Sequence, residues 1–250
     1  MTEAQTAPNP TIPAKDRLII ALDVETADEA RRVVTETAPF AGAFKIGLQL
    51  FVSEGPRFVN DLCNAGHKIF LDLKFHDIPN TVAKAGVEAA RLGVWMFNIH
   101  ALGGNEMMRR CVSEVGNFCQ SANISQPKII AVTVLTSSSD DTLREIGIEA
   151  AADDEVIRLA RLAKAAGLDG VVASARETEL IRQSRRNKFL IVTPGIRPSD
   201  ASNDDQRRVM TPADAVQAGS DHLVVGRPIT SATDMSAAAE KILNEISSAL

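Results

Sequence analysis

Short apolar runs alternate with longer helix-like segments eight times along this chain, and this alternation constrains the fold more than any other feature of the sequence. The runs are nearly continuous in apolar residues, as expected of parallel strands that are covered on both faces. Four of the runs are preceded by a glycine of the kind that ends a helix, namely Gly66, Gly93, Gly167 and Gly219. The pattern predicts strands over Arg17–Val24, Ala43–Leu48, Lys68–Lys74, Val94–His100, Lys128–Leu135, Gly170–Ser174, Phe189–Thr193 and His222–Val225.

The segments between these strands have the spacing of amphipathic helices. Thr26 precedes the first of them, and Glu29 follows three residues later, as in a capping box. The pattern predicts helices over Ala27–Thr37, Gly55–Ala65, Thr81–Leu92, Asn105–Ala122, Asp153–Ala166, Glu177–Gln183, Pro212–Ala218 and Met235–Ser248, with further helical material from Asp140.

Eight strands that alternate with eight helices predict a closed (β/α)8 barrel, the TIM barrel of the α/β class. The length of 250 residues is typical of one such barrel, and no linker divides the chain, so we expect a single catalytic domain over residues 15–250. Residues 1–14 are rich in Thr, Ala and Pro and are expected to form a disordered tail. An open doubly wound sheet is the alternative, but no GxGxxG follows the first strand.

Charge and cysteine content restrict the partners and the compartment. The net charge of −5 and the pI of about 5.5 argue against nucleic acid or an anionic membrane as the main partner. The three cysteines form no CxxC pair, and their odd number fits a reducing compartment rather than a disulfide framework. The sequence shows no long apolar run and no secretory signal. We therefore expect a soluble, cytoplasmic protein.

A cluster of charges follows the third predicted strand, in the segment LDLKFHDIPNTV. Asp72 and Lys74 are two residues apart on one strand and should share a face, with Asp77 just beyond the strand end. Asp23 and Lys45 stand at the equivalent ends of neighbouring strands, where the active site of this fold lies. A buried salt bridge of purely structural value is the alternative. It is the weaker interpretation, because burying so many charges stabilises a fold little more than apolar packing would.

The ends of the seventh and eighth strands indicate a phosphate site, because this fold usually binds phosphate there. Gly226 would let the backbone approach an anion, and Arg227 could bind it with a bidentate fork. The seventh strand runs into Pro194 and Arg197, and a long polar loop over residues 198–211 has the length of a lid. For Arg207 and Arg208 the alternative is a solvated charged loop.

Sequence motifs for metal-dependent chemistry are missing. The chain has no HExxH and no Cys/His cluster, and neither GxSxG nor a Walker loop is present. His76 and His100 lie near the predicted barrel mouth without the spacing of metal ligands. We therefore expect no metal site.

The DxKxxDIPNT motif at Asp72–Thr81 closely resembles that of the orotidine 5′-phosphate decarboxylase family. Further motifs occur in the order found in that family, over residues 17–230: ALDV with Asp23, FKIGLQLF with Lys45, AVTVLTS with Thr136, TPGIRP with Pro194 and Arg197, DDQRR with Gln206, and VVGRPIT with Gly226 and Arg227.

The resemblance implies an enzyme that removes CO2 from carbon 6 of orotidine 5′-phosphate and yields UMP, the last step of UMP synthesis, without metal or organic cofactor. Lys74 would stabilise the carbanion at carbon 6 and protonate it, and Asp72 would hold Lys74 in place beside the substrate carboxylate.

The resemblance also implies how the substrate is held. Asp23 and Lys45 would bind ribose hydroxyls, and Lys45 would complete the charge network with Asp72. Thr136 would meet the pyrimidine. The phosphate would be held by Gln206, Gly226 and Arg227, with help from Arg197, while Pro194 lies in the same motif. A homodimer is implied, in which Asp77 and Thr81 reach the active site of the partner subunit.

Two other functions compete with this one. A hexulose-phosphate synthase or keto-gulonate-phosphate decarboxylase would share DxKxxD but use Mg²⁺. Against it, the motif continues into IPNT, and Lys45 stands on the second strand rather than a metal-binding acid. A non-catalytic phosphate-binding barrel would be expected to lose Asp72 or Lys74 while keeping Arg227, and all three are present.

Overall fold

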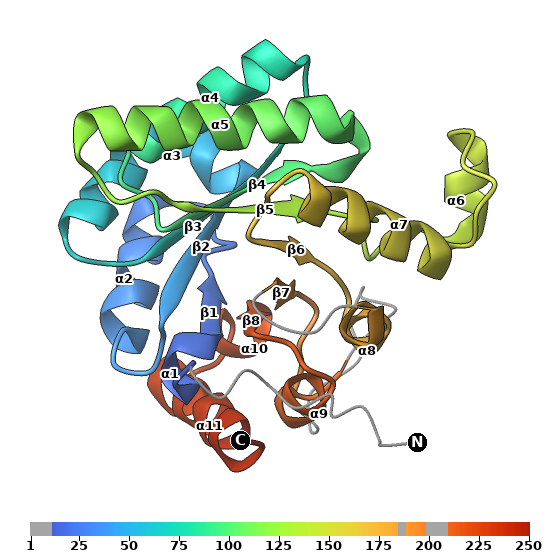
Figure 1. The fold of residues 1–250 in the computed structure, drawn as a ribbon. Coiled ribbons are helices and arrows are strands. Elements are labelled where there is room, and N and C mark those ends of the chain that lie inside the picture. Colours follow the sequence, from blue (N-terminus) through green and yellow to red (C-terminus); the bar gives the residue numbers. More distant parts are fainter. Residues whose placement is uncertain (1–11, 185–188, 199–209) are drawn as a thin grey trace.

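The computed structural model describes residues 12–184, 189–198 and 210–250, and over these residues eight parallel strands close into a barrel in sequence order. The first strand pairs with the second and with the last, so the barrel has no open edge. The predicted (β/α)8 barrel is confirmed (Figure 1). The strands are β1 (Leu18–Ala21), β2 (Ala43–Gly47), β3 (Ile69–Phe75), β4 (Met96–His100), β5 (Lys128–Val132), β6 (Gly170–Val172), β7 (Leu190–Thr193) and β8 (His222–Val225).

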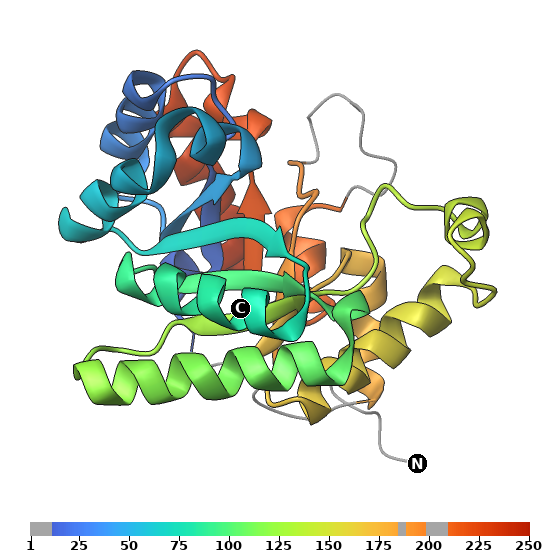
Figure 2. The same cartoon turned by 90° about the horizontal axis from the view of Figure 1, so that it is seen from above.

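Helices surround this barrel, and both views show α4 and α5 side by side along it (Figures 1 and 2). α6, in the segment that joins β5 to α7, projects away from the body of the barrel in both views. The helices are α1 (Ala14–Arg17), α2 (Ala27–Thr37), α3 (Leu48–Asn64), α4 (Pro79–Arg91), the 3-10 turn η1 (Ala101–Gly103), α5 (Gly104–Ala122), α6 (Asp140–Glu145), α7 (Ala152–Ala165), α8 (Ala175–Ser184), α9 (Pro212–Gln217), α10 (Arg227–Thr230) and α11 (Met235–Ser248).

Several element ends differ from the sequence-based expectation. β1 and β5 end before the predicted Val24 and Leu135, where the chain leaves the sheet to form the mouth. α3 begins at Leu48 rather than Gly55, because two helical segments meet at a kink where Gly55 has φ 73° and Pro56 follows. Glycine tolerates this left-handed φ, so the helix resumes beyond it. The predicted tail, 1–14, falls largely outside the described residues, and its disorder stays a prediction.

Two apolar layers hold the barrel together. The larger lies between the sheet and the helices and includes the buried Leu18, Ile20 and Phe97. The smaller fills the barrel interior with side chains from the opposite strand faces: Ile19, Ala21, Ala43, Phe70, Met96, Ile130, Val192 and Val224. Because the strand period is two, one residue can serve the outer layer and the next the inner.

The N-terminal end of the barrel is closed by a buried basic residue. Arg17 is fully buried and donates hydrogen bonds to the carbonyl oxygens of Ser220 and Asp221. The side chain of Asp221 in turn accepts from Arg182 and from the backbone N–H of Ile191. This end is therefore held together by a buried hydrogen-bond network, in which Asp221 Oδ1 is left without a partner. None of the helices within the described residues is both long and apolar enough to span a bilayer.

The barrel wall tolerates no side chain at Gly170 of β6, because a Cβ there would clash with the carbonyl oxygen of Leu190 on β7. We expect Gly170→Ala to destabilise the protein by about 1–3 kcal/mol, since neighbouring strands cannot move apart cheaply. In Gly116→Ala, the control on α5, the nearest atom would be the flexible Gln126 side chain at 3.5 Å, and stability should rise by up to about 1 kcal/mol. Urea denaturation of both variants tests this, and equal effects would contradict it.

Candidate active site

Polar side chains lie one layer above the apolar filling of the barrel, at the C-terminal ends of the strands. Side chains two places apart on a strand face the same side, so the residues that follow the interior residues of β2, β3 and β4 by two places also face inward. Those residues are Lys45, Asp72 and Asn98. The same layer is reached from β3 by Lys74.

Three of these side chains, Lys45, Asp72 and Lys74, form a chain of alternating charge with Asp23, and we call these four residues the Asp/Lys network. The Lys45 ammonium lies 2.9 Å from Asp23 Oδ1 and 3.5 Å from Asp72 Oδ2. The Lys74 ammonium lies 2.8 Å from Asp72 Oδ1. The side chains of Lys45 and Asp72 are only 10% and 15% exposed, whereas Asp23 is 56% exposed at the rim. The structure therefore brings together the four residues that the sequence placed at neighbouring strand ends.

Lys74 has an unusual backbone. The pairing of β3 with β4 shifts register between Leu71 and Phe75, and Lys74 adopts a left-handed φ of 52° within that bulge. Such a conformation costs a non-glycine residue about 1–3 kcal/mol and persists only where its surroundings hold it. Asp72 and Lys74 do meet as predicted, but regular strand alternation is not the reason, because both residues lie within the shifted stretch and Lys74 departs from the extended conformation.

Asn98 of β4 joins the two halves of the bulge, and the sequence analysis missed it. Its side-chain oxygen accepts a hydrogen bond from the backbone N–H of Lys74 at 2.8 Å. Its side-chain nitrogen donates to Asp72 Oδ1 at 2.7 Å. One signal could have revealed it, namely a lone amide within the apolar run VWMFNIH, on the inward face.

The charge on Asp72 is favoured by its neighbours. Burial alone would raise the pKa of this carboxyl group, but the nearby Lys45 and Lys74 ammoniums and the hydrogen bonds from Lys74 and Asn98 outweigh burial, and the pKa lies below its ordinary value. Asp72 is therefore ionised at neutral pH, and it holds two cations in a partly dry site.

A cavity of about 160 Å³ opens beside this network. One wall carries Lys45, Asp72 and Lys74, and Thr136 and Pro194 also line the cavity. The rest of the lining is apolar: Phe70, Val132, Val134, Leu135, Val172, Val192 and Val224. A flat, uncharged ring fits such a lining, and any negative charge that develops at its edge would meet the Lys74 ammonium.

The predicted phosphate residues are described only in part. Gly226 directly follows β8, and a Cβ there would make ordinary van der Waals contacts with Ala21 and Asp23, at 3.5 and 3.6 Å. Arg227 begins α10 beside it, and the largely buried Arg197 donates to the carbonyl oxygen of Ile196. Gln206, Arg207 and Arg208 lie outside the described residues, as does most of the predicted lid.

Asp77 and Thr81 do not join the network within one chain. Both residues are exposed, and Asp77 accepts a hydrogen bond from the backbone N–H of Ile78 at 2.6 Å. In the part of the chain that the structure describes, the Lys74 ammonium forms its ion pair with Asp72 and not with Asp77.

His100 and His76 stack on each other beside the mouth, with ring centroids 5.3 Å apart. The ring of His100 accepts a hydrogen bond from the backbone N–H of Leu102. Burial, and then the nearby His76 and Lys74, lower the pKa of His100 to about 4. His100 is thus a neutral packing group at pH 7. Among the residues at 12–184, 189–198 and 210–250, no three His, Cys, Asp or Glu side chains are grouped as metal ligands.

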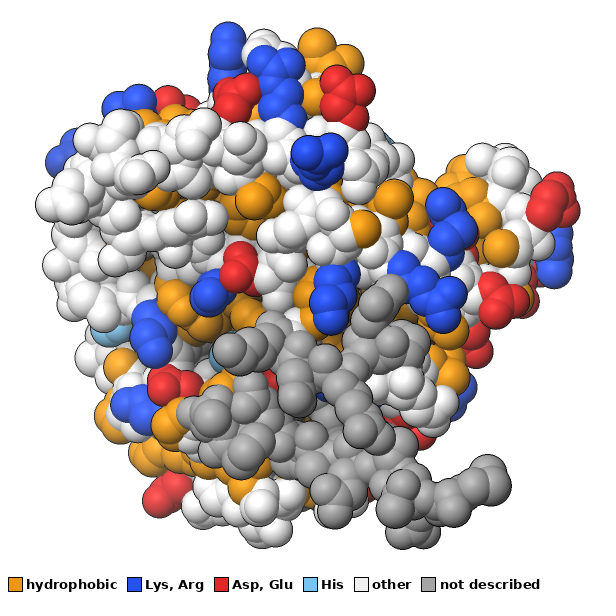
Figure 3. Space-filling model, in the orientation of Figure 1, with side chains coloured by type: hydrophobic (Ala, Val, Ile, Leu, Met, Phe, Trp, Pro, Cys, Tyr) orange, Lys and Arg blue, Asp and Glu red, His pale blue; other side chains and the backbone are white. Residues whose placement is uncertain are grey.

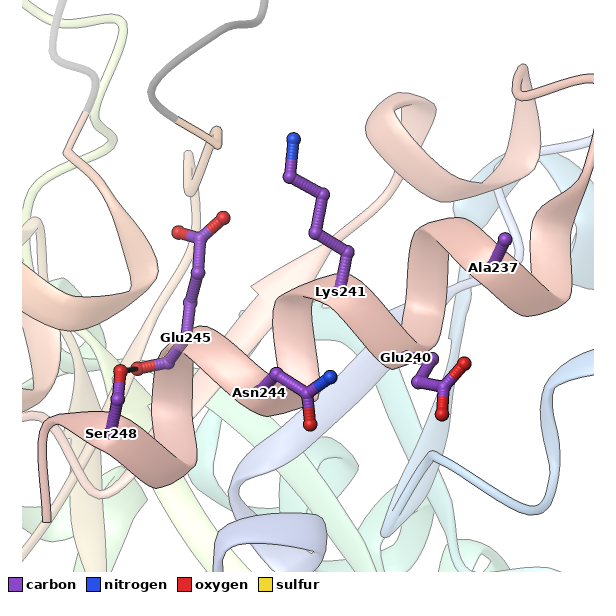
Figure 4. Close-up of a pocket in the computed structure, with 6 residues that line it drawn as sticks. All are labelled: Ala237, Glu240, Lys241, Asn244, Glu245 and Ser248. Carbon is purple, nitrogen blue, oxygen red and sulfur yellow. Dashed lines mark hydrogen bonds between the residues drawn. The ribbon is translucent and has the colours of Figure 1, made fainter.

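A second hollow lies on the outer face of α11, where Ala237, Glu240, Lys241, Asn244, Glu245 and Ser248 line it from a single helix (Figure 4). All six of these residues belong to α11, and none of the predicted site residues is among them. The molecular face in Figure 3 carries acidic and basic side chains interspersed, with hydrophobic ones between them. At the barrel mouth, by contrast, the cavity is lined by the mostly buried Lys45 and Asp72.

Comparison with known proteins bears on this site. The model of a family described as orotidine 5′-phosphate decarboxylase / HUMPS matches residues 16–242. A protein of Syntrophotalea carbinolica named orotidine 5′-phosphate decarboxylase is 52% identical over 239 residues, which cover 96% of this chain and 98% of that protein. A Geobacter metallireducens protein of the same name is 53% identical over 233 residues, 93% of this chain and 97% of its own.

A solved structure agrees with these relatives. The crystal structure of orotidine 5′-phosphate decarboxylase from Lactobacillus acidophilus is similar with a TM-score of 0.81 and 38% identity. The match covers 92% of this chain and 98% of that one. The likeness therefore extends over nearly the whole barrel.

The lowered pKa of His100 predicts a loss of stability in acid. In the unfolded chain His100 takes up a proton near the ordinary histidine pKa of about 6.5. In the folded chain it takes up that proton only near pH 4. The free energy of unfolding should therefore fall as the pH drops through this window, and His222, whose pKa burial also lowers, adds to the fall. In His100→Asn the fall should be shallower. Urea denaturation across the window measures it, and an unchanged slope would show that His100 does not resist protonation.

Proposed function

This chain belongs to the orotidine 5′-phosphate decarboxylase / HUMPS family, and we propose that its Asp/Lys network carries out the chemical step by which orotidine 5′-phosphate loses CO2 and becomes UMP. The reaction itself follows from the family and from relatives at about half identity that carry the decarboxylase name. The observation that supports the network as its machinery is the ion pair of Lys74 with Asp72, whose side chain is only 15% exposed, at the wall of a largely apolar cavity.

The chemistry requires a cation at one place. When the bond between carbon 6 and the carboxylate breaks, CO2 leaves and the electron pair stays on carbon 6. The Lys74 ammonium would stabilise this carbanion and then give it a proton, which forms the new C–H bond and leaves a neutral amine to be reprotonated from solvent. Asp72 would keep the ammonium in place without being consumed, because its lowered pKa keeps it ionised.

The remaining residues would bind the nucleotide. We assign the ribose hydroxyls to Asp23 and Lys45, which form one ion pair at the rim. Thr136 and Pro194 line the cavity where the pyrimidine would lie. The phosphate is assigned to Gly226 and Arg227, with Arg197 and Gln206 assisting. Binding energy from a phosphate far from carbon 6 can support the reaction by holding the substrate in place.

We propose a homodimer through the rim of β2, β3 and β4. Four large apolar side chains are exposed in the segments that follow these neighbouring strands: Leu48, Val52, Ile78 and Leu102. Such a surface is typical of a protein–protein contact. Asp77 and Thr81 stand within it, so pairing through this rim would carry them to the partner subunit's site. The expected cytoplasmic location stays a prediction.

A direct assay tests the function. Purified protein should deplete orotidine 5′-phosphate, followed by its absorbance, and should do so in the presence of EDTA. A requirement for Mg²⁺ with a hexulose phosphate as substrate would instead favour the other activity named in the family. Binding of UMP without turnover would favour a phosphate-binding barrel without catalysis.

Lys74→Ala removes both the counter-charge and the proton donor. We expect kcat to fall by more than the factor of about 10²–10⁴ that proton transfer alone contributes. Affinity for UMP should fall much less, because UMP has no carboxylate at carbon 6. Lys128→Ala is the matched control, since Lys128 pairs with Asp169 at the start of β5 and should keep full activity. Steady-state kinetics and UMP titration decide, and near-normal turnover of Lys74→Ala would refute its role.

Mixing two inactive variants tests the shared site. Asp77→Ala subunits keep Lys74, and Lys74→Ala subunits keep Asp77, so a hybrid dimer would hold one site with neither lesion. With random exchange half of the dimers are hybrids, and each has one intact site of two, so roughly a quarter of wild-type activity should return. If subunits exchange and no activity returns, Asp77 acts within its own chain.

A further inference from the structure

We propose that Asn98 is a positioning residue, which holds the Lys74 ammonium on Asp72 by fixing the backbone of Lys74 and the carboxylate of Asp72 at the same time. The inference rests on the proposed function, because it concerns the geometry of the same network. Asn98 is 1% exposed and is absent from the lining of the cavity, so it acts through its neighbours rather than on the substrate.

The bulge in β3 creates the need for such a residue. Between Leu71 and Phe75 the ladder to β4 is interrupted, and a buried backbone N–H without a partner is costly. The backbone N–H of Lys74 lies in this gap and donates to the side chain of Asn98 at 2.8 Å. The bond therefore stabilises the left-handed φ of 52° that Lys74 adopts.

The chemistry of the two neighbours determines which way the amide points. The backbone N–H of Lys74 can only donate, and the ionised Asp72 can only accept. The oxygen of Asn98 must therefore face Lys74, and its nitrogen must face Asp72, as the two hydrogen bonds have it. An ionised carboxylate at this position would set two negative groups against each other, so the position requires a neutral side chain that accepts and donates.

Asp72 Oδ1 accepts from both the Asn98 amide and the Lys74 ammonium, at 2.7 and 2.8 Å. Loss of the amide would leave this oxygen with the ammonium alone and would let the bulge relax. Since a shift of about 1 Å in a reacting group can cost about 10² in rate, the loss should appear in turnover.

The loss of Asn98 should change how kcat depends on pH, because the groups around Asp72 control its ionisation. Lys45 faces it from β2 and Lys74 from its own strand, while Asp23 reaches it through Lys45 and His100 stands two residues beyond Asn98 on β4. The Asn98 bond is one of the contacts that lower the pKa of Asp72. Without it the carboxylate would be protonated at a higher pH, and the acid limb of the kcat profile would move upward.

Three variants of the full-length protein test the proposal, with orotidine 5′-phosphate as substrate and UMP as the binding probe. In Asn98→Ala we expect kcat to fall by about 10² while the Kd for UMP changes only a few-fold, and we expect activity relative to wild type to fall further as the pH drops. Asn60→Ala is the matched control, because Asn60 donates to the carbonyl oxygen of Leu92 away from the mouth and should keep wild-type kcat.

Asn98→Asp should show the opposite pH trend. A second carboxyl group beside Asp72 in a buried site has a raised pKa. Once protonated it offers the donor and the acceptor that the amide offered. Its activity relative to wild type should therefore rise as the pH drops, whereas that of Asn98→Ala falls.

The outcomes separate the two levels of inference. An inactive wild-type protein would overturn the proposed function itself. An active wild type with unchanged kcat in Asn98→Ala would overturn the positioning role alone. Parallel loss of kcat and of UMP-binding sites, with pH profiles unchanged, would also overturn it, because that is the result of poor folding. Opposite pH trends of the Ala and Asp variants, with UMP binding retained, would support it.

Discussion

The carboxylate of Asp72 is the charge on which the rest of the site depends. It lies between the Lys45 and Lys74 ammoniums, 3.5 and 2.8 Å away, inside the barrel mouth. Without it two cations would face each other in a partly dry space, where their repulsion is weakly screened. With it, the Lys74 ammonium is held 2.8 Å from Asp72, at the wall of the cavity where negative charge would develop on the substrate. The pKa of Asp72 stays low because its neighbours outweigh the cost of burial.

The closed barrel makes this arrangement possible. Its interior is filled from below by an apolar layer that includes Phe70 and Met96, and the network occupies the next layer on the same strand faces. Charges deeper in the barrel could not be reached by a substrate that enters from solvent. Charges nearer the rim would be screened by water. The bulge imposes a left-handed backbone on Lys74, and in this conformation its ammonium forms an ion pair with Asp72.

Much of this could be predicted from the sequence. The alternation of apolar runs with helical segments predicted the barrel, and the polar residues that end those runs predicted Asp23, Lys45, Asp72 and Lys74 as neighbours. The predicted start of the second helix at Gly55 was wrong, because the Gly-Pro pair there was interpreted as the beginning of a helix. At Gly55 and Pro56 the dihedral break is real, but helical structure precedes it as well as following it. Gln206 belongs to a segment outside the described residues, so its part in phosphate binding stays a prediction.

The sequence by itself determined that Asp23, Lys45, Asp72 and Lys74 lie at the barrel mouth, because strand and helix periodicities are local properties that each segment carries in its own order of apolar and polar residues. Only the tertiary structure decided how Lys74 is held there. Its left-handed backbone and its bond to Asn98 arise from the register between β3 and β4, which joins residues 24 positions apart in the sequence. Register depends on which neighbour a strand pairs with and on what the pair must bury, and no single segment records that.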